Sequence, residues 1–67
     1  MNDNQRTKVL DYLKQNEGKF ISKSETIHKA NVFAGSFNDD DLDFLSSCGV
    51  SVERIRSMIY FKYIKRK

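Results

Sequence analysis

The sequence predicts a small, mainly α-helical domain of three to four helices, with the whole chain, residues 1–67, in one domain. Apolar residues recur at helical spacing in several segments, each of the three glycines follows such a segment, and proline is absent. One cysteine and one histidine exclude an internal disulfide and the usual Cys/His zinc sites. Ordinary apolar packing must therefore build the core, and we expect no metal and no cofactor.

The first helix is expected from about Asn4 to Asn16, because Val9 and Leu13 place apolar side chains on one face of such a helix. Gly18 follows as a left-handed cap. Residues 19–21 then form a short extended piece before the next helix begins.

Two further helices are predicted in the middle of the chain. One runs from Lys23 to about Ala34, since Ser22 and Glu25 have the spacing of a capping box. The other begins after Asn38, a good cap, and carries the acidic residues of segment 39–43 in its first turns. We interpret this acidic run as capping and dipole chemistry, because it lacks the alternating ligands of a calcium loop.

Residues 49–51 are predicted to form a turn, followed by a fourth helix from Val52 to about Ile59 with Ile55 facing inward. Segment 59–64 is rich in strand-forming residues. Two alternatives stay open here: the helix continues, or this segment is a strand. In the second case a short two-stranded sheet forms from about residues 19–21 and 59–64.

Residues 41–60 resemble a helix-turn-helix. Gly49 sits at the turn, Val50 at the apolar plug and Ser51 at the cap of the second helix. Leu45 departs from the family pattern, which usually has a small residue where the two helices approach each other. The resemblance implies that residues 52–59 are a recognition helix that enters the major groove of DNA.

The whole chain also resembles a reduced winged helix, a fold that runs helix, short strand, helix, recognition helix and two-stranded wing. Residues 9–26 resemble its opening helix and strand. Only nine residues follow Met58, which leaves too little chain for a full wing. We therefore expect the wing to be cut to one strand or replaced by a helix.

These resemblances imply a small DNA-binding regulatory protein, of the kind found on phages and other mobile elements. Its expected partner is double-stranded DNA, and a homodimer is an open alternative to a monomer. Basic residues support this function, since six of the twelve lie in the last fourteen positions. The expected contacts from the recognition helix are Ser51, Glu53, Arg54, Arg56, Ser57 and Tyr60. The expected phosphate contacts are Lys62, Lys65, Arg66 and Lys67.

The alternative function is a small protein-binding inhibitor or adaptor of a larger nucleic-acid or transcription machine. Its contacts would be the acidic segment 39–43 and exposed aromatic residues. No phosphate-binding loop or catalytic motif is present, so we do not expect an enzyme. No apolar run is long enough to cross a membrane, and the first residues lack a signal-peptide pattern. We expect a cytoplasmic protein that makes no membrane contact.

Overall fold

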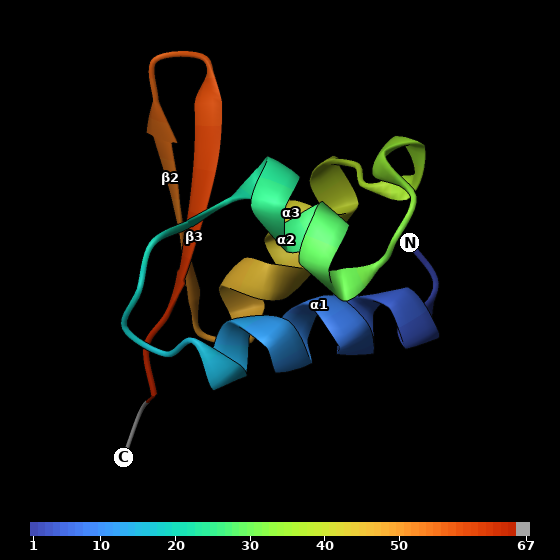
Figure 1. Cartoon of the computed structure of the whole chain (residues 1–67), viewed down its shortest axis with the longest axis horizontal. Coiled ribbons are helices and arrows are strands. Elements are labelled where there is room, and N and C mark those ends of the chain that lie inside the picture. Colours follow the sequence, from blue (N-terminus) through green and yellow to red (C-terminus); the bar gives the residue numbers. More distant parts are fainter. Residues whose placement is uncertain (66–67) are drawn as a thin grey trace.

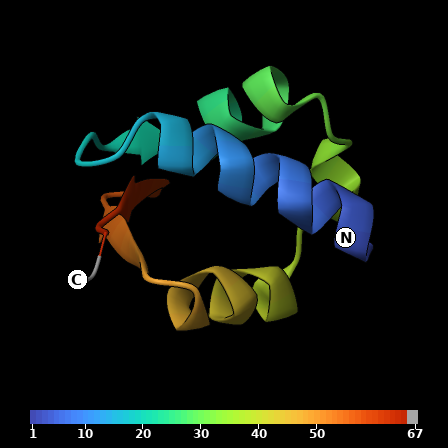
Figure 2. The same ribbon diagram turned by 90° about the horizontal axis from the view of Figure 1, so that it is seen from below.

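A computed structural model describes residues 1–65, which form three α-helices, one 3-10 turn and a three-stranded antiparallel sheet. In chain order the elements are α1 (Asp3–Gln15), β1 (Ile21–Ser22), α2 (Lys23–Ala30), η1 (Ala34–Ser36), α3 (Asp39–Ser47), β2 (Val50–Ile55) and β3 (Met58–Tyr63). The strand order is β1-β3-β2. In Figure 1, β2 and β3 extend as a hairpin beyond the helices. Figure 2 shows the strands gathered at one end of the helices.

The three α-helices lie close to their predicted positions. α1 differs from the prediction by one residue at each end, and it buries Val9 and Leu13. α2 begins where expected, and the Ser22 hydroxyl accepts a hydrogen bond from the backbone N–H of Glu25 at 3.1 Å. It ends about one turn earlier than predicted, because Asn31 adopts a left-handed backbone conformation with φ of 56°.

The prediction of a mainly α-helical domain is wrong, because residues 52–59 form a β-hairpin instead of a fourth helix. Two residues, Arg56 and Ser57, connect the strands, and Arg56 has a φ of 60°. The spacing of the apolar residues fits a helix, but their β-branched side chains also favour a strand. The strand forms because Val52 pairs with Phe61, which is buried in the core and places β3 beside β2.

β3 is the central strand of the sheet and pairs on both of its edges. Of the two alternatives for segment 59–64, the strand that pairs with the early extended piece is confirmed, with Ile21 opposite Phe61 and Ser22 opposite Tyr60. The sheet has three strands, where that alternative had two. The nine residues after Met58 were expected to be too few for two strands, but the structure forms a two-stranded hairpin. Its first strand, β2, precedes Met58 and lies mostly in the segment that the sequence pattern assigned to a helix.

The core lies between the helices and the face of the sheet that is turned toward them. Phe61 is fully buried, and its ring stacks on that of Phe37 with centroids 5.8 Å apart. The sheet is therefore held to the helices by its central strand. The buried apolar residues are Val9, Leu13, Ile21, Ala30, Phe37, Leu42, Leu45, Val50 and Phe61.

One acidic residue, Asp41, is fully buried at the first turn of α3 and binds two cations. Its carboxylate accepts hydrogen bonds from the α-amino group of Met1 at 3.0 Å, from Nε of Arg6 at 3.0 Å and from the backbone N–H of Asn38 at 2.9 Å. Burial raises the pKa of this carboxyl, but the Asn38 hydrogen bond and the two cations outweigh burial and hold the pKa below its ordinary value. We call these three charged residues, Met1, Arg6 and Asp41, the buried ion cluster.

Candidate nucleic-acid interface

The sheet has two different faces, because successive side chains of a strand point to opposite sides. Val50 and Phe61 are buried and define the inner face, which packs on the helices. The other side, which we call the outer sheet face, carries the alternate residues of both long strands. These are Ser51, Glu53 and Ile55 of β2 and Met58, Tyr60 and Lys62 of β3.

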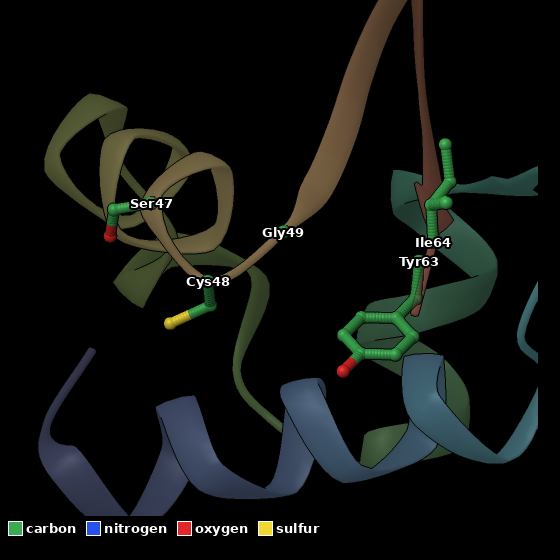
Figure 3. Close-up of a pocket in the computed structure, with 5 residues that line it drawn as sticks. All are labelled: Ser47, Cys48, Gly49, Tyr63 and Ile64. Atoms are coloured by element: carbon green, nitrogen blue, oxygen red, sulfur yellow. The ribbon is translucent and has the colours of Figure 1, made fainter. Parts of the chain in front are cut away.

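Phe20 and Ile64 extend the outer sheet face beyond the strand ends. Nζ of Lys62 lies 4.9 Å from the ring centroid of Phe20, a cation–π contact that places this ring on the same side of the sheet. Ile64 follows β3 and donates its backbone N–H to the carbonyl of Gly49, so the strand alternation continues to it. Figure 3 shows Ile64 and Tyr63 pointing to opposite sides of the chain, with the Tyr63 ring over α1.

The recognition helix predicted for residues 52–59 is therefore wrong, and the structure redistributes its contact residues over the hairpin. Ser51 does not cap a helix but pairs with Lys62 within the sheet. The structure brings four predicted contacts together on the outer sheet face: Ser51, Glu53, Tyr60 and Lys62. It separates the others: Arg54 lies on the opposite face, Arg56 and Ser57 form the turn, and Lys65 follows β3. Arg66 and Lys67 lie outside the described residues.

The tip of the hairpin is basic and exposed. Arg54 and Arg56 are both exposed, and Arg56 is the first residue of the two-residue turn, where it has a left-handed backbone conformation. Arg54 also borders a shallow hollow of about 320 Å³ that Asp39 and Asp43 of α3 line from the other side. The carboxylates of Asp39 and Asp43 weaken the positive potential around Arg54. A phosphate group is therefore attracted more strongly to Arg56 than to Arg54.

Helix α3 carries the opposite charge. Its first turns hold Asp39, Asp40 and Asp43, all three exposed, in addition to the buried Asp41. Carboxylates near a helix N-terminus stabilise the helix through its dipole. They also repel phosphate groups, so α3 is unsuited to approach a nucleic-acid backbone.

Apolar side chains on the outer sheet face were missed by the sequence analysis. Four of the five large hydrophobic residues that are exposed lie there: Phe20 (54%), Ile55 (55%), Met58 (44%) and Ile64 (51%). The helical pattern had assigned Ile55 and Met58 to the inner side of a helix. A signal for the correct assignment was present in residues 50–55, where Val50 and Val52 alternate with polar residues as in a strand.

The hollow at the junction of α3 and the sheet is open and lies below the usual size of a small-molecule pocket. It is drawn in Figure 3, measures about 250 Å³ and is lined by Ser47, Cys48, Gly49, Tyr63 and Ile64. Ligand pockets are typically enclosed apolar cavities of about 300–1,000 Å³. Within residues 1–65 no group of three or more His, Cys, Asp or Glu side chains is placed to hold a metal ion. None of the helices in this range has the length and apolar character needed to cross a membrane.

Comparison of the chain with protein families, curated proteins and solved structures finds no match.

Proposed function

We propose that this chain is a small DNA-binding protein of the winged-helix type that contacts duplex DNA with the β2–β3 hairpin. The order of its elements supports this proposal, since α1, β1, α2, α3, β2 and β3 follow one another as expected for that fold. The observation that carries the proposal is the charge of the hairpin. Between positions 50 and 65 the chain has four basic residues, Arg54, Arg56, Lys62 and Lys65, and one acidic residue, Glu53.

The hairpin, and not a helix, is the contact element in this proposal. The helix that occupies the recognition position of the fold is α3, and its exposed residues Asp39, Asp40 and Asp43 would face the phosphates on either side of a groove. Six residues at about 3.3 Å each give the hairpin a length of about 20 Å. This length lets Arg56 at the tip and Lys65 just past the base reach different phosphates of one strand.

The contact is expected to be electrostatic and insensitive to sequence. Phosphate contacts by Arg and Lys provide affinity and orientation but carry no base information. With three to four phosphates neutralised, the slope of log K against log salt is expected to be about −3. Replacing both Arg54 and Arg56 by Ala should reduce the magnitude of this slope by about 2.

The test is a salt titration of binding to a fluorescent generic duplex, measured by anisotropy for the wild type and two double variants. Arg54→Ala/Arg56→Ala removes the tip cations, while Lys8→Ala/Lys29→Ala removes the same charge from exposed positions on α1 and α2. We expect the first variant to lose affinity and slope, and the second to lose much less of either. If the two variants behave alike, the hairpin is not the contact element.

The alternative, a protein-binding inhibitor or adaptor, is favoured by a different observation. Exposed apolar side chains on the outer sheet face, such as Ile55 and Met58, are typical of surfaces that bind other proteins. A wild-type protein that shows no binding to any duplex at low salt, and one stoichiometric protein partner in a pull-down, would favour this function over DNA binding.

A further inference from the structure

Apolar and charged residues on the outer sheet face are distributed so that the face is complementary to itself. Along β3 and the residue after it, the outward side chains are Met58, Tyr60, Lys62 and Ile64, with apolar groups at both ends. Glu53 lies on the same face, on the neighbouring strand and opposite Tyr60. We propose that this face binds the outer sheet face of a second copy of the chain, in a two-fold symmetric dimer.

One two-fold axis satisfies both the apolar and the charged residues. It runs across the strands, between Tyr60 and Lys62, and reverses the strand direction in the second copy. Met58 then lies against the partner's Ile64, and Tyr60 lies against the aliphatic stem of the partner's Lys62. Both contacts occur twice because a two-fold interface repeats every contact.

Charge selects this axis over the other face-to-face arrangement. With the axis across the strands, Glu53 lies on the facing sheet, about 10 Å away, and one strand spacing, about 4.8 Å, to the side of the partner's Lys62. The Lys62 ammonium, which lies over Phe20 on the β1 side of the sheet in the monomer, turns toward the β2 side to meet it. Two opposite-charge contacts form in the dimer. An axis along the strands would instead place Lys62 directly against the partner's Lys62, an unfavourable pair of like charges.

The size of the face predicts a weak dimer. The two long strands, about 4.8 Å apart and about 20 Å long, cover about 200 Å² in projection, and the two residues of β1 add little. Stable protein dimers bury about 800 Å² on each partner. We therefore expect a dissociation constant on the order of 100 µM, so that the monomer predominates in dilute solution.

Sedimentation velocity between about 10 µM and about 1 mM measures this equilibrium in the absence of DNA, so its result is independent of the proposed function. The wild type should shift from monomer to dimer over this range. Glu53→Lys and Lys62→Glu should each weaken the dimer by about tenfold or more, because each places like charges together. An equimolar mixture of these two variants should dimerise again, since each then meets the opposite charge.

Control variants separate the interface from general charge effects and from unfolding. Lys29→Glu and Asp11→Lys change exposed residues on α2 and α1, and their mixture should not associate more than the wild type. Far-UV circular dichroism confirms that each variant is folded. Met58→Asp, at an exposed position, should abolish the dimer without unfolding the monomer.

Two results would overturn the proposal. A wild type that stays monomeric at the highest concentration leaves the outer sheet face free for another macromolecule. A mixture of Glu53→Lys and Lys62→Glu that fails to associate, with both variants folded, shows that these residues do not meet across an interface.

Discussion

Replacing Asp41 by asparagine removes the only negative charge from the buried ion cluster while keeping the size and shape of the side chain. The amide oxygen of asparagine still accepts the hydrogen bond from the Asn38 backbone N–H, which is 2.9 Å long in the wild type. The α-amino group of Met1, which is fully buried and 3.0 Å from the carboxylate, loses its counter-charge. Arg6, which is partly exposed, is better able to regain solvation.

The expected cost follows from the burial of both partners. Removing one member of a buried ion pair typically costs about 3–5 kcal/mol, because the remaining charge is left without compensation. A domain of this size has a total stability of about 3–10 kcal/mol. Asp41→Asn should therefore remove a large share of the free energy of unfolding and lower Tm by more than about 12 °C.

Thermal and urea unfolding followed by circular dichroism measure this loss, with Asp40→Asn as the matched control. Asp40 is the preceding residue and is exposed in the same turn of α3, so its replacement forfeits only a dipole interaction of about 0.3–1 kcal/mol. The protein should carry any tag at its C-terminus so that the Met1 amine stays free. Equal losses of stability in the two variants would refute the structural role assigned to the buried ion cluster.

Three further outcomes are expected. The wild type should lose stability when the pH is lowered below about 4, because the pKa of Asp41 is lower in the folded than in the unfolded chain. In this acid range the urea midpoint of the wild type should approach that of Asp41→Asn. Arg56→Gly should stabilise the protein by about 0.5–1 kcal/mol, since glycine adopts a φ of 60° without strain, and a lower urea midpoint would contradict this reasoning. The same variant should weaken DNA binding, because it removes a cation from the hairpin tip. Phe61→Ala should cost about 3–5 kcal/mol in urea unfolding, whereas Phe33→Ala, at an exposed position, should cost little; comparable losses would show that the sheet is not anchored through Phe61.

The sequence alone determined three of the four predicted helices, and it offered one strand pairing as one of two alternatives. Local sequence was sufficient for these helices, because the residues that define a helix act within one or two of its turns. Ser22 caps the start of α2, and Val9 and Leu13 form the buried face of α1. The strand-forming residues of segment 59–64 left a strand open beside a continued helix, and the structure has the strand, with Ile21 opposite Phe61.

Only the tertiary structure decided the state of residues 50–55 and the faces of the hairpin. Val52 and Ile55 have helical spacing, whereas Val50 and Val52 have the alternation of a strand, so the segment carries both patterns. The choice depended on a neighbouring strand that places Phe61 beside Val52. The same choice moved Ile55 from an expected core position to the outer sheet face. Asp41 shows the same limit: local sequence indicates a capping residue, but only the folded chain brings the Met1 amine to it, because that contact joins residues 40 positions apart.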